Sequence, residues 1–210
     1  MGKARTFVVA GATGRQGSAT ARHLINSRNR VIGITHTPTK APRLESMGVI
    51  PLVADLRDSS TLMLHLKEID GFFLVTDPFA KSKETGDIDD WVADELRQGE
   101  QALEAAWDAK VPHVVLGSVS LAAQAKGLAI HKTKIKIEKH AREFGLSYTA
   151  LRPPFFMEDW VPNSGFPTPW TENGRFEASV KSDTPIPHIA TDDVGRIAAW
   201  SFDHPDESRA

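Results

Sequence analysis

Three glycines stand three residues apart in the run GATGRQG at residues 11–17, which follows an apolar stretch and opens a helical pattern. Gly11 would permit a tight turn off a strand, Gly14 a close approach of a pyrophosphate to the backbone, and Gly17 close packing of helix against sheet. The N–H groups at the start of the helix would then face the phosphates. The run predicts a dinucleotide-binding loop, although a vestigial nucleotide fold with an empty site would carry it too. The residues assigned to the loop are Gly11, Thr13, Gly14, Arg15, Gln16 and Gly17.

The residues after the second predicted strand bear on which dinucleotide is bound. An NAD site usually carries Asp or Glu about 20 residues beyond the glycines, where it binds the ribose hydroxyls. Here the first acidic residue of the chain is Glu45. A 2′-phosphate would instead be attracted by Lys40, Arg15 and His36, so the sequence favours NADP over NAD. His36 could equally be an exposed loop histidine.

Asp55 and Leu56 follow the third predicted strand. Asp55 could accept a hydrogen bond from an adenine amino group, with Leu56 against the ring. It could equally take part in capping the next helix, together with Asp58, Ser59 and Ser60.

The elements that must position these groups alternate between strands and helices. Predicted strands are 6–10, 30–35, 49–53, 71–75, 112–117 and 147–151, and predicted helices are 15–27, 40–47, 59–68, 88–109, 132–144 and 191–202. The strands are apolar without clean alternation, as expected where both faces of a sheet are covered. The order therefore predicts an α/β fold, a doubly wound parallel sheet of Rossmann type with right-handed crossovers. Trp91 and Trp107 fall on the apolar stripe of helix 88–109 and are predicted to be core residues.

The pattern changes after residue 151. Residues 153–187 are rich in proline and in large aromatic side chains, which is typical either of a lid or binding loop or of a loop that covers the core. We divide the chain into a NAD(P)-binding Rossmann domain at 1–152 and a short, partly irregular C-terminal region at 153–210, which forms the substrate side and packs on the same domain.

Composition narrows the possible chemistry. The 210 residues include no cysteine, which excludes disulfides, iron–sulfur clusters and thiolate metal sites, and no His, Asp and Glu grouping has metal spacing. Residues 1–44 hold eight Lys and Arg residues and no acidic residue, which suits an anionic ligand, although a solvated basic surface would look the same. The net charge of −2 and the absence of a long apolar run argue against nucleic-acid and membrane partners. We expect a cytoplasmic protein, with a nuclear location also open for a regulator.

Several motifs, taken in order, resemble the NmrA-like group of atypical short-chain dehydrogenases/reductases. The glycine run is followed by GFFLVT at 71–76, by His131 and Lys134 with Glu138, by LRPPFFME at 151–158 and by DDVGR at 192–196. The resemblance covers about residues 5–203. It implies a Rossmann fold, NADP binding, and either reductase activity or redox-sensing regulation.

The resemblance also implies where some residues lie against the cofactor. It places Thr76 and Pro78 near the middle of the dinucleotide, and Pro153 and Phe155 near the nicotinamide. The family continues past the last helix, whereas this chain stops at Ala210, so its substrate pocket could be smaller or more open.

The sequence departs from the related classical reductases, which use a Tyr-x-x-x-Lys pair to pass a proton to a carbonyl. Tyr148 is the one tyrosine, it lies in a predicted buried strand, and Arg152 stands four residues later. We therefore expect Tyr148 to pack rather than to react. The spacing from His131 to Lys134 is one residue shorter than is usual in the family, so Lys132 and Lys136 remain alternatives for the family lysine.

Lys134 is the leading catalytic candidate. On a helix it would neighbour Glu138, and its ammonium group could hydrogen-bond the nicotinamide ribose and polarise an acceptor oxygen. Ser118 follows the fifth strand at the sheet edge where ligands bind, and could orient a substrate or, in place of Lys134, stabilise the charge that develops on the acceptor oxygen. The plainer interpretations are an exposed helical lysine and a serine that caps a turn.

Two functions remain open on the sequence. The first is an oxidoreductase that transfers hydride from NADPH to a small apolar acceptor, such as an enone or a quinone, without a Tyr-x-x-x-Lys pair. The second is a non-catalytic NADP-binding redox sensor that controls a protein partner such as a transcription factor. The missing tyrosine favours the sensor, and the run PPFF at 153–156 favours the enzyme. The sequence does not predict an oligomeric state.

Overall fold

The computed structural model describes residues 4–77, 87–120, 129–161, 181 and 183–210. Six parallel strands form one sheet in the order β3-β2-β1-β4-β5-β6. The strands are β1 (Thr6–Val9), β2 (Arg30–Thr35), β3 (Ile50–Val53), β4 (Gly71–Leu74), β5 (Val114–Gly117) and β6 (Tyr148–Leu151). The predicted Rossmann-type sheet is confirmed, and each strand begins within two residues of its predicted start. The strand order reverses at β1, which pairs with both β2 and β4.

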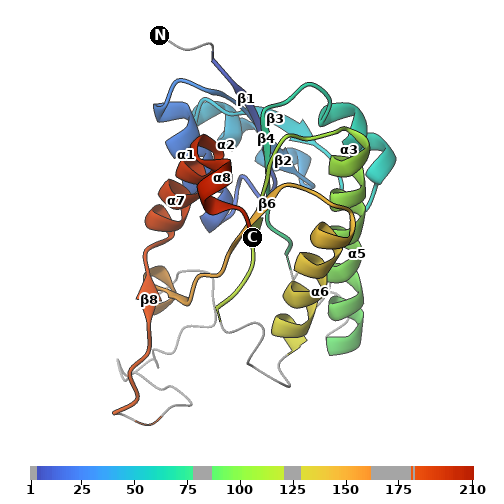
Figure 1. Ribbon diagram of the computed structural model, residues 1–210. Coiled ribbons are helices and arrows are strands. Elements are labelled where there is room, and N and C mark those ends of the chain that lie inside the picture. The colour runs from blue at the N-terminus through green and yellow to red at the C-terminus, as the bar shows by residue number, and fades with distance from the viewer. Residues whose placement is uncertain (1–3, 78–86, 121–128, 162–180, 182) are drawn as a thin grey trace.

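Helices cover both faces of the sheet (Figure 1). On one face lie α1 (Arg15–Asn26), α2 (Ala41–Ser46) with a preceding 3₁₀ turn η1 (Pro38–Lys40), and α7 (Thr191–Asp203). On the other lie α3 (Ser59–His65), α5 (Ile88–Asp108) and α6 (Ala129–Glu143). A short helix, α8 (Pro205–Ser208), leads back to β6, where the Ala210 N–H donates to the Tyr148 carbonyl at 2.9 Å. None of the described helices is both long and apolar enough to cross a membrane.

Strand residues alternate between two separate cores. Val8 belongs to the cluster under α3, α5 and α6, whereas its neighbours Phe7 and Val9 belong to the cluster under α1, α2 and α7. Both faces therefore need apolar side chains, which explains why the strands read as continuous apolar runs.

Two local features fix where α3 begins and how closely α7 approaches α1. Asp58 caps α3 by accepting a hydrogen bond from the Thr61 N–H at 3.0 Å. Hydrogen bonds from Thr61 and Ser60 lower the pKa of Asp58 to about 2. On the other face, a Cβ added at Gly195 of α7 would lie 2.5 Å from the backbone of Ala19, so glycine lets α7 lie directly against α1.

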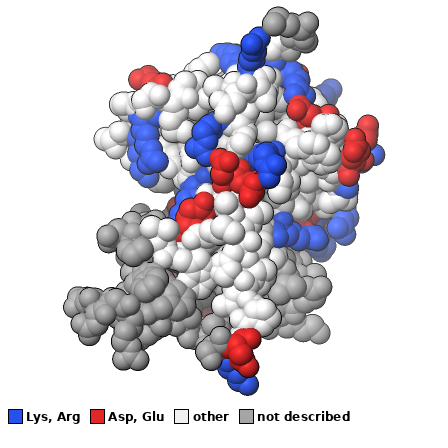
Figure 2. Space-filling view, turned by 90° about the vertical axis from the view of Figure 1, so that its left-hand side faces the viewer, with Lys and Arg blue, Asp and Glu red and all other residues white. Residues whose placement is uncertain are grey.

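Figure 2 shows the face formed by α1 and α7, where acidic and basic side chains are interleaved. The ion pairs on it include Arg22 with Asp192 at 2.6 Å and Arg196 with Asp193 at 2.6 Å. Hydrogen bonds from Arg22 and His23 lower the pKa of Asp192. The basic residues of α1 are therefore partly neutralised by acidic residues of α7, which the charge count along the chain did not reveal.

The structure differs from the sequence prediction in three places. A two-stranded parallel sheet pairs β7 (Phe155–Phe156) with β8 (His188–Ile189), and the 3₁₀ turn η2 (Met157–Trp160) follows β7 directly. The helix α8 was not predicted. The prediction that Trp107 is a core residue is wrong, because it is 53% exposed and lies beside Phe144, outside both core clusters. Trp91 is half-buried.

Candidate cofactor and active site

The glycine loop joins β1 to α1 in the geometry that its spacing predicts. Gly11 has a φ of 59°, and its carbonyl accepts from the Gly14 N–H at 2.8 Å. A Cβ at Gly17 would lie 2.3 Å from the Gly11 carbonyl oxygen, a distance that no side chain tolerates. Gly14 is the N-cap of α1 and forms no side-chain hydrogen bond, so no side chain of the cap occupies the first N–H groups of the helix. This cradle fits a pyrophosphate.

The loop lies where the strand order reverses, and the ends of β4 and β5 adjoin it. A Cβ at Gly11 would meet Val75 just past β4, at 2.8 Å, and one at Gly117 would meet Gln16 Oε1 at 3.3 Å. That oxygen of Gln16 is buried and has no hydrogen-bond partner among the described residues. A buried acceptor of this kind is costly unless a ligand or water satisfies it. Gln16 thus supports the fit of a dinucleotide at this edge.

Arg15 begins α1 and reaches across to the C-terminal region. Its guanidinium forms an ion pair with Asp159 of η2. Through this ion pair, the glycine loop and the segment after β7 are in direct electrostatic contact. Thr13, in the same loop, is half-buried.

His36 and Lys40 are both exposed, just after β2. The chain turns there through Thr35, whose hydroxyl accepts from the Thr37 N–H at 3.2 Å. The position at which NAD sites usually carry a carboxylate therefore carries none, as the sequence indicates.

Asp55 is exposed and holds Arg57 rather than capping α3. Its Oδ1 accepts from the Arg57 backbone N–H and from Nη1, both at 2.9 Å. Arg57 reaches on to Asp94 of α5, with Nε–Oδ1 and Nη2–Oδ2 distances of 2.7 and 2.6 Å. The Asp94 hydrogen bond, opposed by burial, raises the pKa of Arg57. Of the predicted capping group, Asp58 caps α3 and the Asp55 side chain does not, whereas the adenine contact of Asp55 stays a prediction. Leu56 packs against the core cluster.

Lys134 is buried, with 6% of its surface exposed, whereas Lys132 and Lys136 are exposed. Its Nζ donates to Thr76 Oγ1 at 2.6 Å and lies 2.8 Å from Glu95 Oε1. Thr76 stands just past β4, close to the glycine loop. Lys134 is therefore the member of the lysine run that reaches the carboxyl edge of the sheet.

The expected pairing of Lys134 with Glu138 is replaced by two other pairs. Glu138 is held by Arg152, at 3.0 Å from Nε to Oε1, and accepts the Ser118 hydroxyl at 2.5 Å. Burial opposes ionisation, but hydrogen bonds from Arg152 and Ser118 lower the pKa of Glu138. Ser118 is thus one end of a Ser–Glu–Arg group in which Ser118 and Glu138 are buried and Arg152 is half exposed, separate from the contacts of Lys134.

Glu95 belongs to this site although no sequence motif singles it out. It is fully buried in α5 and accepts from Thr76 Oγ1 at 2.9 Å, as well as from Thr133. A charged residue at a buried position of the helix was the available signal, but only the fold shows that Lys134 lies opposite.

The structure describes some of the residues predicted to lie near the nicotinamide and the middle of the cofactor. Pro153 is buried, and its carbonyl accepts from the Ser120 N–H at 2.9 Å. Phe155 is 57% exposed and its ring lies 6.3 Å from that of His188. Pro78 lies outside the described residues. Beside β7 and β8 is an open, mostly apolar hollow of about 510 Å³, lined by Met157, Trp160, Thr184, Ile186 and His188.

Tyr148 is buried in β6, and its hydroxyl has no hydrogen-bond partner within the described ranges. Its side chain belongs to the core cluster under α3, α5 and α6. The expectation that Tyr148 packs within a buried strand is confirmed, and the expectation that it takes no part in the chemistry stays a prediction.

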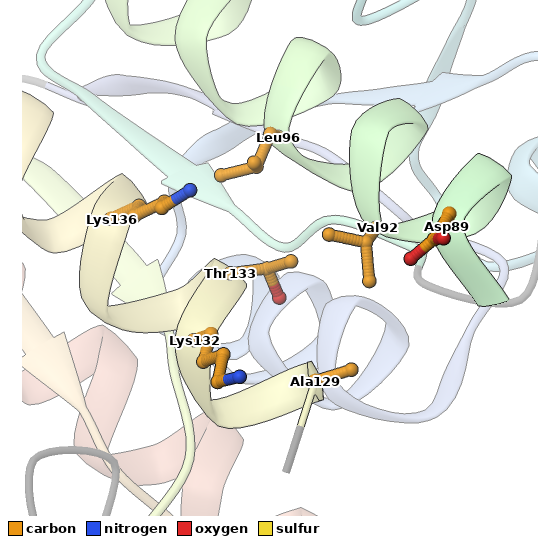
Figure 3. Close-up of a pocket in the computed structure, with 7 residues that line it drawn as sticks. All are labelled: Asp89, Val92, Leu96, Ala129, Lys132, Thr133 and Lys136. Carbon is orange, nitrogen blue, oxygen red and sulfur yellow. The ribbon is translucent and has the colours of Figure 1, made fainter. Parts of the chain in front are cut away.

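A smaller cavity of about 180 Å³ lies between the first turns of α5 and α6. Figure 3 shows Val92 and Leu96 of α5 projecting towards Thr133 and Lys136 of α6. Its wall thus includes Thr133, whose hydroxyl donates to Glu95.

The chain spans about half the length of the curated relatives that it matches. It is 28% identical over 153 residues to an NAD(P)H azoreductase of Xenophilus azovorans, covering 73% of this chain and 49% of that protein. It is 25% identical over 160 residues to quinone oxidoreductase 2 of Escherichia coli (strain K12), covering 75% and 51%.

Solved structures share the fold. An NADPH-dependent quinone oxidoreductase of Escherichia coli, complexed with NADPH, superposes with a TM-score of 0.75 at 23% identity over 93% of this chain and 64% of that one. The negative transcriptional regulator NmrA in complex with NADP superposes with a TM-score of 0.78 at 19% identity over 100% and 65%.

A family model settles the relationship. The model of the NmrA-like family matches residues 3–210, a range that includes the glycine loop, the buried Lys134 and α7. This chain belongs to the NmrA-like family.

Proposed function

We propose that the chain binds NADP(H) and reduces a small, uncharged, apolar carbonyl acceptor, such as a quinone or an enone, without a Tyr-x-x-x-Lys pair. The observation that carries the proposal is a buried lysine, Lys134, held by Thr76 at the edge of the sheet where the glycine loop lies. The name of the quinone oxidoreductase relative agrees with a carbonyl acceptor, and the name of the NAD(P)H azoreductase relative agrees with reduction by NAD(P)H.

The loop residues Gly11, Gly14 and Gly17 would hold the pyrophosphate through backbone N–H groups, and the oxygen of Gln16 would accept from the ligand. The 2′-phosphate would be attracted by three basic residues: Arg15 in the glycine loop, and His36 and Lys40 just after β2. Strand β2 carries no carboxylate that would repel the phosphate. Asp55 and Leu56 remain the proposed adenine contacts, and Pro153 and Phe155 the proposed nicotinamide contacts. NADPH, when bound, supplies the hydride.

Lys134 would serve as the hydrogen-bond donor to the acceptor. An ammonium group has three N–H bonds; among the described residues one of them donates to Thr76, and the group forms an ion pair with Glu95. A remaining N–H can donate to a ligand oxygen on which negative charge grows as hydride arrives, which stabilises the transition state more than the ground state.

Ser118 would contribute differently from Lys134. Its single hydroxyl proton is donated to Glu138, so it offers a ligand only oxygen lone pairs. We therefore assign Ser118 to orienting a ligand N–H or O–H group, and not to stabilising an oxyanion.

The test is NADPH oxidation, followed by loss of its near-ultraviolet absorbance, with a panel of quinones and enones. We expect acceptor-dependent turnover, and Lys134→Ala should lose about 10²–10³-fold in kcat, the usual cost of one oxyanion donor. Lys132→Ala and Lys136→Ala, on the exposed side of the same helix, should keep the wild-type rate. No turnover with any acceptor, or equal rates for all three variants, would contradict the proposal.

One observation favours the second function. Tyr148, the one tyrosine of the chain, is buried in β6 and is followed four residues later by Arg152. An NADP-binding redox sensor with a protein partner needs no Tyr-x-x-x-Lys pair. A sensor must bind NADP⁺ and NADPH with different affinities. Tight but unequal binding of the two, together with no turnover on the whole panel, would favour the sensor.

A further inference from the structure

Glu95 is a carboxylate with no exposed surface, in the first half of α5, facing α6. Three donors converge on it: Thr76 Oγ1 at 2.9 Å and Lys134 Nζ at 2.8 Å on Oε1, and the Thr133 hydroxyl on Oε2. A buried carboxylate is costly unless its oxygens are hydrogen-bonded and its charge is compensated. Glu95 meets both conditions through residues of α6 and of the loop after β4.

The packing of α5 on α6 brings these groups together. One turn beyond Glu95, Gly99 leaves room for Ile137, which would lie 2.5 Å from a Cβ at that position. Ile137 in turn stands one turn beyond Lys134 on α6. The close contact at Gly99 therefore sets the spacing at which Lys134 reaches Glu95.

The hydrogen bonds hold the ammonium group in place. Thr76 has one hydroxyl proton, which it donates to Glu95, so its lone pairs are left to accept from Lys134 at 2.6 Å. The ammonium group donates one N–H to Thr76 and lies 2.8 Å from Glu95 Oε1 in an ion pair, so it is anchored to these two neighbours. An N–H that is not directed at Thr76 remains for a ligand oxygen.

We propose that Glu95 is the positioning residue of this site, which holds Lys134 and Thr76 so that one N–H of Lys134 is presented to the acceptor oxygen. The inference rests on the proposed reductase function and deepens it. The Lys134–Glu95 pair is neutral as a unit, so the site offers a donor without a net charge. Such a site takes uncharged carbonyl acceptors in preference to carboxylates.

The positioning role of Glu95 is tested by measuring turnover in variants of Glu95 with and without Lys134. Glu95→Gln should lower kcat on the order of 10²-fold, the usual cost of a misplaced catalytic group, and should change the NADPH Kd and the acceptor KM only slightly. The double variant Glu95→Gln/Lys134→Ala should be no slower than Lys134→Ala alone, because residues that act as one unit are not additive. If the kcat losses of the two single variants instead multiply in the double variant, the inference is overturned.

A second readout needs neither cofactor nor turnover. Acylation of Lys134 by an acid anhydride can be followed by mass spectrometry, with the exposed Lys132 and Lys136 as internal references. Glu95→Gln should speed the acylation of Lys134 about tenfold relative to these lysines, because the amine is released from its partners. If the acylation rate of Lys134 relative to Lys132 and Lys136 is the same in Glu95→Gln as in the wild type, the inference is overturned.

Controls separate positioning from folding. Asp94→Asn removes the charge of the neighbouring buried carboxylate, which binds Arg57 at 2.6 Å. At saturating NADPH it should keep kcat and the acylation ratio. If Glu95→Gln does not fold, Thr133→Val, which removes one donor to Glu95, should give a smaller effect of the same sign in both assays. Faster acylation in a protein whose wild type never turns over would uphold the positioning of Lys134 while rejecting the reductase function.

Discussion

Arg15, at the first position of α1, forms an ion pair with Asp159, which lies 144 residues further along the chain in η2. Both side chains are largely buried, with 27% and 14% exposed. The pair joins the predicted phosphate loop to the segment beside the apolar hollow, whose lining includes Met157 and Trp160. A cofactor phosphate at the loop would compete with Asp159 for the same guanidinium.

Asp159→Asn should therefore strengthen NADPH binding. The amide keeps an oxygen acceptor for the Phe156 N–H but removes the negative charge that competes for Arg15. We expect a two- to fivefold lower Kd by calorimetry, which corresponds to an ion pair worth up to about 1 kcal/mol. Arg15→Ala/Asp159→Asn should show no such gain over Arg15→Ala. Weaker binding by Asp159→Asn would contradict the competition.

Two alanine substitutions in the glycine loop should have different effects. Gly17→Ala places a Cβ 2.3 Å from the Gly11 carbonyl oxygen and should lower the free energy of unfolding by about 1–3 kcal/mol, the usual cost of overpacking. At Gly14 the corresponding distance is 3.2 Å and φ is −87°, so Gly14→Ala should fold almost normally yet lose NADPH affinity. Urea unfolding and calorimetry measure the two properties. Normal NADPH affinity in Gly14→Ala would contradict the assigned phosphate contact.

The wild type should bind NADP(H) more tightly than NAD(H), because the 2′-phosphate would meet Lys40, Arg15 and His36 and no carboxylate of β2. Lys40→Glu combined with Arg15→Ala should narrow the difference in affinity, measured by calorimetry at low salt. Lys132→Glu, a charge change at an exposed position of α6, serves as the control and should leave the ratio of the NADP(H) and NAD(H) affinities unchanged. Equal wild-type affinities would reject this account.

Stability should decrease at acidic pH through His113. Burial, reinforced by the positive charge of Arg209 and opposed by Asp206, lowers the pKa of His113, whose ring nitrogens bond Ser147 and Thr149. The unfolded chain thus takes up a proton before the folded protein does. The free energy of unfolding should fall as the pH drops below the ordinary histidine pKa of about 6.5, by at most about 1.4 kcal/mol per pH unit.

His113→Gln should flatten this part of the profile in urea unfolding between pH 5 and 7, a range of about one unit on either side of the histidine pKa. His65→Gln, at an exposed position of α3, is the matched control and should leave the slope as it is. An identical slope in wild type and His113→Gln would show that another group carries the pH dependence.

The fold was predictable because its signals are local. The glycine spacing, the apolar strand runs and the helical stripes each depend on near neighbours, and together they predicted all six strands of the main sheet. The two-residue strands β7 and β8 were not predictable, because they pair across more than 30 residues and carry no periodic pattern of their own. The placement of Trp107 was missed because a helical stripe does not show how far a helix extends beyond the core.

The sequence by itself determined the residue types of the site: the glycine loop, the missing carboxylate after β2, and the lysine run of α6. Only the tertiary structure decided their partners. Lys134 pairs with Glu95 and not with Glu138, and Arg15 pairs with Asp159. The physical reason is that a long charged side chain can choose among several carboxylates, and the choice depends on which one is buried within reach, a property of the packing of α5, α6 and η2 and not of sequence spacing.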